Sequence, residues 1–387
     1  MQNNLLITMS GGTTCVINAT LAGIIEAAQK SGKINKIFGG HNGLSGVLNN
    51  DLIDLTELDA KRLQQVYYTP ASGLIGTSRI RPIDQNEITV LSEIFDKKDI
   101  KYFFNIGGNG TIKQSMAISS DENINVVSIA KTVDNDLGDE EFKRVYYTPG
   151  YPSCANYWAH KIHIFNQENL GAYSHDQVLI AQTFGRETGH LAACARLADS
   201  ERKLPLLILL PEDQQTPEEL IYSIKHTIRI HGRAMVVMSE GYYVADIGVR
   251  RDPSGQVMYG TSQTTQAQNL VNLLFECGIQ ARTFIPGFDQ RSDILFATKQ
   301  DLAYAYGLGD YAIQKVLEGD SRFLASISFI DDSPQYSKIP FSEIGDFTRT
   351  LPDRWLKRGE YDVSDEFIQY AMPFIDYELV KTRFYLK

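Results

Sequence analysis

The segment Lys131–Asp136, with the sequence KTVDND, places two carboxylates, an amide, a hydroxyl and an ammonium group next to one another. It follows residues 125–130 (NVVSIA), an apolar and β-branched run that predicts a buried strand. At the end of such a strand, one carboxylate could take a proton from a hydroxyl group while the other holds Mg²⁺ or orients the first. The lysine could neutralise phosphate oxygens. A turn with solvated charges is the simpler alternative, because Asn and Asp are common turn formers.

A repeated order of elements places this segment in a larger pattern. Apolar strands end in glycine-rich or charged clusters, and helices follow them. Glycines let the backbone approach a ligand, and free N–H groups at a helix N-terminus bind phosphate. We therefore predict a doubly wound α/β architecture, with these strand ends along one crevice between two domains. The strand ends are Gly11–Gly12, Gly107–Asn109, Lys131–Thr132, Gly185–Arg186, Glu240–Gly241 and Gly287–Arg291.

The overall charge makes local clusters of basic residues informative. With 37 Lys and Arg against 47 Asp and Glu, the net charge is −10, which argues against generic nucleic-acid binding. An acidic protein that binds anions must gather its cations locally, and Arg79 and Arg81 form such a cluster in a loop. They are either phosphate ligands or solvated loop residues.

Length and cysteine content favour a protein of the cytoplasm with more than one domain. The 387 residues are enough for two or three domains. The 4 cysteines are far apart and form no CxxC pair, which argues against a zinc site or a disulfide framework. Because no apolar run reaches about 18 residues, we expect no transmembrane helix and no membrane partner.

In the order of its motifs the chain resembles the phosphofructokinase family over roughly residues 5–320. The family implies two Rossmann-like three-layer domains with the active site in the cleft between them. Residues 1–150 plus about 290–340 would form the phosphoryl-donor domain, and residues 151–289 plus about 341–387 the sugar phosphate domain. The matching motifs are Ser10–Gly12, Gly107–Gly110, Lys131–Asp136, Phe184–Arg186, Glu240–Gly241, Arg282 and Gln290–Arg291.

The activity that this resemblance implies is transfer of a phosphoryl group to the 1-hydroxyl of fructose 6-phosphate, a step of glycolysis. Asp134 would be the general base, and the implied catalytic residues are Asp134, Arg186, Lys131 and Thr132. The implied donor-binding residues are Gly11, Gly12, Arg79, Gly108, Asn109, Gly110 and Thr111. The implied sugar-phosphate residues are Thr132, Asp134, Phe184, Gly185, Arg186, Glu240, Arg282, Phe288 and Arg291. Asn109 and Asp136 would hold the cofactor Mg²⁺.

Two features of the sequence disagree about the phosphoryl donor. In the family, an Asp at the position of Gly110 together with a Lys at Lys131 is similar to the pyrophosphate-dependent type. The lysine is present here, but the glycine leaves room for ATP. Residues 16–18, 46–49 and 148–151 look most like a bacterial pyrophosphate-dependent branch. We therefore expect pyrophosphate slightly ahead of ATP.

Departures from the family pattern leave the acceptor open. Gln177 stands where bacterial ATP-dependent tetramers have an arginine, and Gln182, Phe184 and Phe288 replace the usual Glu, Met and His or Tyr. The alternatives are the same chemistry on another sugar phosphate, such as sedoheptulose 7-phosphate, and a low-activity regulatory relative that binds sugar phosphate. The resemblance also implies a homodimer or homotetramer.

Overall fold

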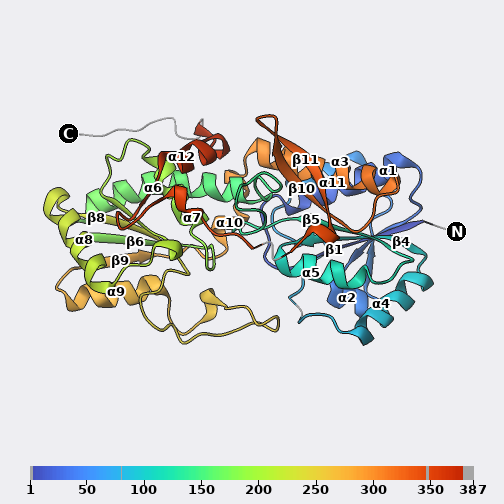
Figure 1. Ribbon diagram of the computed structural model, residues 1–387, viewed down its shortest axis with the longest axis horizontal. Helices are drawn as coiled ribbons and strands as arrows, with labels where there is room; N and C mark the ends of the chain where they lie inside the picture. Colours follow the sequence, from blue (N-terminus) through green and yellow to red (C-terminus); the bar gives the residue numbers. More distant parts are fainter. Residues whose placement is uncertain (1–2, 80, 346–347, 378–387) are drawn as a thin grey trace.

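Two large β-sheets organise the chain, one in each half of an elongated molecule (Figure 1). The computed structural model describes residues 3–79, 81–345 and 348–377. Each sheet has helices on both faces, so each half is a three-layer α/β domain (Figure 1). The predicted fold class is confirmed. None of the helices in these ranges is long and apolar enough to cross a membrane.

The first sheet has seven strands in the order β11-β10-β5-β4-β1-β2-β3. The five central strands are parallel, and the two edge strands β3 and β11 are antiparallel to their neighbours. Both faces of β1 are buried, which is why its sequence is a continuous apolar run rather than an alternating one. The strands are β1 (Asn4–Met9), β2 (Ile37–Gly40), β3 (Leu52–Asp54), β4 (Ile100–Gly107), β5 (Asn125–Ala130), β10 (Phe323–Ile330) and β11 (Ser333–Pro340).

Alternate residues of β1 contact different helix layers. Leu5 and Ile7 share a core with α1 (Ile17–Ser31), α3 (Ala60–Tyr68) and α11 (Lys299–Leu317). Leu6 faces the opposite layer, because successive side chains of a strand point to opposite faces. The helices of that layer are α2 (Leu44–Leu48), α4 (Gln85–Lys97) and α5 (Asn109–Ile118).

The second sheet is parallel throughout, in the order β7-β8-β6-β9. One face packs against α6 (Tyr151–Ala172), α7 (His190–Ala193) and the 3₁₀ turn Cys194–Ala198, and the other against α8 (Pro217–His231) and α9 (Gln266–Glu276). The strands are β6 (Val178–Thr183), β7 (Leu206–Leu209), β8 (Ala234–Ser239) and β9 (Ala281–Phe284).

The C-terminal segment, residues 348–377, packs on the second domain. It contains the short strands β12 (Leu356–Lys357) and β13 (Asp362–Val363) and the helix α12 (Asp365–Ala371). Its aromatic side chains enter the core formed by α6, α7 and the second sheet. At its start, Thr348 forms a β-bridge with Leu137, so this segment also reaches the loop that follows β5.

The predicted boundary between donor and sugar phosphate domains stays a prediction. The first sheet takes its strands from residues 4–130 and 323–340, and the second from residues 178–284. Residues 1–2, 346–347 and 378–387 of the predicted domains lie outside the described residues.

Candidate active site

Lys131 links the ends of β5 and β1. The side chain is buried, and its Nζ donates hydrogen bonds to the carbonyl oxygens of Ser10, at 3.0 Å, and of Gly12. Burial, and next the Arg291 guanidinium, lower the pKa of Lys131 to about 7. The first glycine turn thus holds an ammonium group that titrates near neutral pH.

Asp134 and Asp136 form a pair of acids after β5. The Asp134 backbone N–H donates to Thr132 Oγ1 at 3.2 Å, and that hydroxyl lies 3.4 Å from Asp134 Oδ2. Burial raises the pKa of Asp134, against the lowering effect of Arg186. Burial and then the charge of Asp134 raise the pKa of Asp136 to about 6. The two acids therefore influence each other's ionisation.

The second sheet contributes Arg186 after β6 and Glu240 after β8. The Arg186 backbone N–H donates to Glu240 Oε1 at 3.1 Å. A Cβ on Gly241 would lie 1.8 Å from the carbonyl oxygen of Arg186, so only glycine permits this contact between the two strand ends. Burial and then the charge of Asp134 raise the pKa of Glu240 to about 8. The strand ends of the second sheet thus lie within electrostatic reach of the acids of the first.

Arg291 follows the last strand of the second sheet and lies on Phe184. The guanidinium carbon is 5.3 Å from the centre of the Phe184 ring. Gln290 fixes this arrangement, because its Oε1 accepts from the backbone N–H of Phe184 at 2.8 Å and from Trp158 Nε1 at 3.0 Å. Arg291 Nε is buried and has no hydrogen-bond partner among the described residues.

Three cations surround the turn at Gly12. A Cβ on Gly12 would lie 2.8 Å from Nη1 of Arg291 and 3.8 Å from Nη2 of Arg79. Lys131 binds the carbonyl oxygen of the same glycine. Cations that crowd one glycine turn repel one another, so an anionic ligand such as phosphate stabilises the group.

The turn before α5 borders the acid pair. Asn109 Nδ2 lies 3.4 Å from Asp136 Oδ2, Thr111 is buried, and Gly108 precedes the helix. Gly110 is exposed, and a Cβ there would meet no atom within 4 Å. Gly110 itself therefore presents no steric obstacle to a bound molecule.

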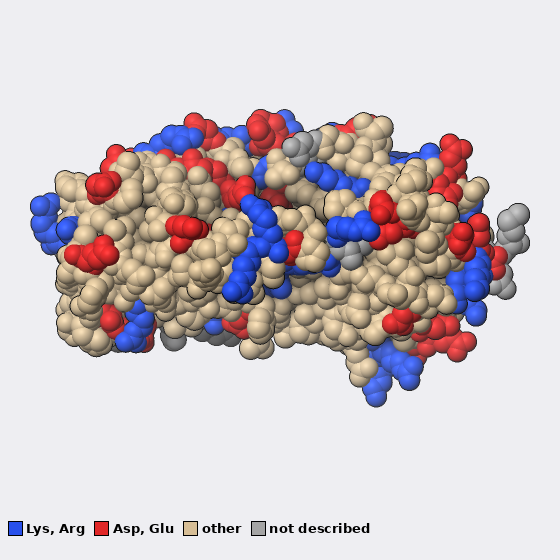
Figure 2. Space-filling model, turned by 90° about the horizontal axis from the view of Figure 1, so that it is seen from below, with Lys and Arg blue, Asp and Glu red and all other residues tan. Residues whose placement is uncertain are grey.

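An ion pair joins the two halves of the molecule beside the turn at Gly12. Arg79 Nη1 lies 3.3 Å from Oδ2 of Asp252, whose side chain is 3% exposed. Asp252 belongs to residues 244–262, a long connection from β8 that extends toward the first half (Figure 1). Seen from below, Lys and Arg side chains gather near the middle of the molecule (Figure 2). No motif pointed to Asp252 in the sequence.

Two predicted sugar-phosphate residues have exposed side chains. Arg282, early in β9, forms an ion pair with Asp176 at 2.7 Å, and its side chain is 57% exposed. Asp176 precedes β6, so Arg282 lies toward the amino ends of the parallel strands, opposite the site. Phe288 is 72% exposed. The remaining predicted residues, from Gly11 to Arg291, line the strand ends described above.

The residues fit a magnesium ion that also binds phosphate. The described residues contain no group of three or more His, Cys, Asp or Glu side chains that could hold a metal. Mg²⁺ is commonly bound by one or two carboxylates together with substrate phosphates and water. Asp136, beside the amide of Asn109 and within electrostatic reach of Arg186 and Lys131, provides such a set.

Comparison with known proteins agrees with this geometry. The phosphofructokinase family model matches residues 4–316. The chain is 29% identical to a pyrophosphate–fructose 6-phosphate 1-phosphotransferase of Methylococcus capsulatus, over 97% of this chain and 92% of that protein. A sulfofructose kinase of Alkalicoccus urumqiensis is 23% identical over 91% of each chain. The crystal structure of a pyrophosphate-dependent phosphofructokinase from Nitrosospira multiformis superposes with a TM-score of 0.85 at 27% identity, over 97% of this chain and 92% of that one.

Proposed function

The chain belongs to the phosphofructokinase family, and we propose that it transfers a phosphoryl group from pyrophosphate or ATP to the 1-hydroxyl of fructose 6-phosphate. The observation that carries this proposal is the position of Asp134. This acid lies within electrostatic reach of Lys131, Arg186 and Arg291, which come from the ends of strands in both sheets. A base surrounded by cations is what transfer between two anionic substrates requires.

Asp134 acts as the general base that takes the proton of the sugar hydroxyl. Its raised pKa brings it closer to neutral pH, where a base is most effective. Arg186, Lys131 and Arg291 neutralise the phosphoryl group as it moves, and Thr132 contacts that group or the sugar. Because the transition state is loose, charge neutralisation and alignment supply most of the catalysis.

Asp136 and Asn109 hold Mg²⁺ in this proposal. When bound, the ion neutralises charge on the phosphate oxygens of the donor. Gly11, Gly12, Arg79, Gly108, Gly110 and Thr111 form the rest of the donor side. Phe184, Gly185, Arg186, Glu240 and Arg291 bind the sugar phosphate, and Arg282 and Phe288 join them on the family resemblance alone.

The division of labour follows the two domains. Residues 1–150 plus about 290–340 bind the donor, and residues 151–289 plus about 341–387 bind the sugar phosphate. We place the enzyme in glycolysis in the cytoplasm, as a homodimer or homotetramer.

Pyrophosphate is the donor that we favour, because the relatives with the highest identity reported above carry it in their names and Lys131 is present. The test is an assay of purified protein with Mg²⁺ and fructose 6-phosphate, supplied with pyrophosphate or ATP. Turnover with pyrophosphate alone supports the proposal. Turnover with ATP alone would show that the space at Gly110 decides the donor.

The acceptor is tested in the same assay. Phe184, with Arg291 stacked on its ring, gives the sugar pocket a different shape from the methionine that is usual in the family. One relative is also named a sulfofructose kinase. Sedoheptulose 7-phosphate and 6-sulfofructose are therefore supplied in parallel with fructose 6-phosphate. Fructose 6-phosphate should give the highest kcat/KM, and a tenfold preference for either of the others would replace it as the substrate. Absence of turnover with every combination of donor and sugar would favour a regulatory protein that binds sugar phosphate.

A further inference from the structure

The residue between the two acids, Asn135, is held by three residues that are distant from it in the sequence. It is fully buried and has a left-handed backbone with φ 54°, which Asn tolerates better than most residues. Its Oδ1 accepts from the backbone N–H of Thr148 at 3.3 Å and from Nη2 of Arg349 at 2.7 Å. Its Nδ2 donates to the hydroxyl of Tyr370 at 3.0 Å. The direction of both acids depends on the backbone at this residue.

Arg349 is the centre of these contacts. It belongs to the C-terminal segment and is 1% exposed. Its Nε donates to the carbonyl oxygen of Asn135 at 2.9 Å, and its backbone N–H donates to that of Asp136 at 2.8 Å. The guanidinium also donates to the carbonyl oxygens of Asp139, Val145 and Tyr146. Its carbon lies 3.7 Å from the centre of the Phe142 ring.

Arg349 forms no ion pair with a carboxylate among the described residues. In the ranges that the structure describes, carbonyl and amide oxygens accept its hydrogen bonds, and no ion pair joins it to an acid. Positive charge in a poorly solvated place acts over a longer distance than at the surface.

We propose that Arg349 is a positioning residue of the active site, which holds Asn135 and the Asp136 peptide so that the acid pair keeps its place. The assignment of chemistry to this pair rests on the proposed function. Other charged groups that face the pair are Arg186 after β6, Lys131 after β5, Arg291 after β9 and Glu240 after β8. None of them contacts Asn135 through a hydrogen bond within the described residues, so they do not replace Arg349 as a support.

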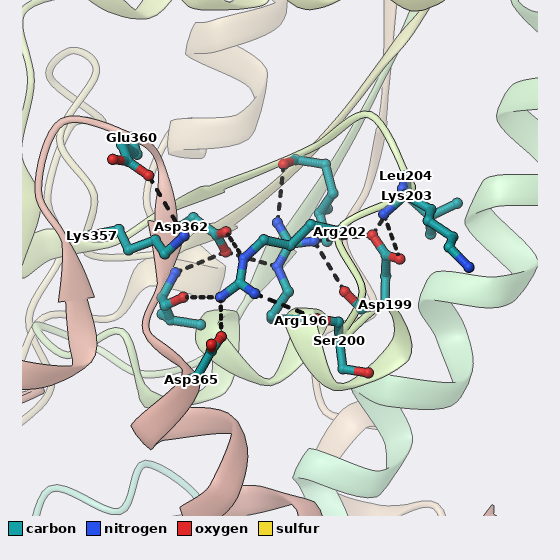
Figure 3. A network of polar contacts seen from close by, with 12 residues as sticks. Arg196, Asp199, Ser200, Arg202, Lys203, Leu204, Lys357, Glu360, Asp362 and Asp365 are labelled. Carbon is teal, nitrogen blue, oxygen red and sulfur yellow. Dashed lines mark hydrogen bonds and ion pairs between the residues drawn. The ribbon is translucent and has the colours of Figure 1, made fainter.

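Arg196 provides a matched control. It is 2% exposed and, like Arg349, ties the C-terminal segment to the rest of the chain. Its guanidinium binds Asp362 at 2.7 Å and Asp199 at 3.0 Å (Figure 3). Its guanidinium also donates to the carbonyl oxygens of Asp199 and Leu206, away from the acid pair. Its loss removes a buried arginine without touching the active site.

The test compares Arg349→Met, Arg349→Lys and Arg196→Met in the full chain. We measure thermal unfolding, kcat and KM across pH 5–9, and hydrogen exchange of peptides that span residues 134–148. For Arg349→Met we expect kcat to fall about 100-fold, KM for the sugar phosphate to change less than about threefold, and exchange at 134–148 to rise.

Arg349→Lys should recover part of kcat, since it keeps the charge but not the planar set of donors. For Arg196→Met we expect a lower unfolding temperature with kcat within about twofold of the wild type at a temperature where it is folded. Equal losses of kcat in the two Met variants, or unchanged exchange at 134–148 in Arg349→Met, would overturn the proposal.

Two further arms keep the test decisive. If Arg349→Met does not fold, Tyr370→Phe removes only the hydroxyl that binds Asn135 and should raise exchange at 134–148 with a milder loss of kcat; no change in either would overturn the proposal. If the wild type shows no turnover with any donor and sugar, the proposed function fails. The exchange measurement still decides whether Arg349 holds the loop.

Discussion

Two buried arginines attach the C-terminal segment, and their surroundings differ in kind. Arg196 is surrounded by carboxylates: Asp199 and Asp362 bind it, and Arg202 shares Asp362 at 2.8 Å (Figure 3). Arg349 is surrounded by carbonyl oxygens and an aromatic ring. The first arrangement cancels its own charge, whereas the second leaves a positive charge beside the active site. We name the first group, residues 196, 199, 202 and 362, the ion clamp.

The difference shows how similar residues serve stability in one place and chemistry in another. A buried ion pair costs several kcal/mol when one partner is removed, because the other charge stays buried. Its outward field is small, so it does little to a distant acid. A cation held by neutral oxygens also needs its hydrogen bonds, but its field remains available. The acids near Arg349 have shifted pKa values that depend on such fields.

The largest expected effect on kcat comes from removing a carboxylate at the active site rather than one in the ion clamp. Asp134→Ser should lower kcat by about 10³-fold if Asp134 is the general base, with KM for the sugar phosphate nearly unchanged. Asp199→Asn removes a carboxylate of the ion clamp and should leave kcat of the folded protein within about twofold. Steady-state kinetics of both variants, at a temperature where both are folded, provide the test. Similar kcat values for wild type and Asp134→Ser would remove Asp134 from the mechanism.

Breaking the ion clamp should affect stability instead. Asp362→Asn leaves Arg196 with one carboxylate and weakens the anchor of Arg202. We expect the free energy of unfolding to fall by about 3 kcal/mol, as for other buried pairs that lose a partner. Urea unfolding measures this change, and kcat of the folded variant checks that the site is intact. A loss below about 1 kcal/mol would mean that water or a rearrangement of nearby side chains compensates the charge left on Arg196.

The pH dependence of stability sharpens the comparison. Glu240 has a pKa of about 8 in the folded chain, above its ordinary value of 4.5. Between these values the folded state binds more protons than the unfolded state, so the contribution of Glu240 to stability falls as pH rises from about 4.5 to about 8. Glu240→Gln should therefore gain stability relative to the wild type between pH 5 and pH 8. Urea midpoints at pH 5, 6.5 and 8 measure this, and a constant difference would contradict it.

The smallest effect is expected at the exposed edge of the clamp. Lys357 and Glu360 lie 3.7 Å apart, and their side chains are 35% and 68% exposed (Figure 3). Solvent screens such a pair, so Glu360→Gln should change the free energy of unfolding by less than about 0.5 kcal/mol. The measurement is again urea unfolding. A loss of unfolding free energy as large as that of Asp362→Asn would show that the exposed pair of Lys357 and Glu360 is needed for the stability of the ion clamp.

The fold and the strand ends could be predicted from the sequence because they are encoded locally. The strand at 125–130 is an apolar run with a polar cluster after it, and the structure forms β5 over the same residues. Gly241 was part of a motif, and its close contact with Arg186 explains why that position is glycine. Features of this kind can be predicted because a few neighbouring residues determine them.

The supports of the site could not be predicted in the same way. Arg349 is 214 positions from Asn135 and lies in a part of the chain without clear periodicity. Asp252 lies in a long connection and finds Arg79 only in the folded molecule. A motif gave the position of Arg282 in the chain, but the edge of the sheet on which it lies follows only from the fold. Its role at the sugar phosphate stays a prediction. The roles of the two domains remain predictions.

In the proposed mechanism, the ion pair between Arg79 and Asp252 provides the donor side with a resident counter-ion. A phosphate that binds Arg79 must take the place of a carboxylate, so donor binding is an exchange of one anion for another rather than an addition. The same carboxylate is available to replace the phosphate when the product leaves. The pair thus narrows the free-energy difference between the empty and the loaded enzyme, which limits affinity and favours rapid release in either direction of the reaction.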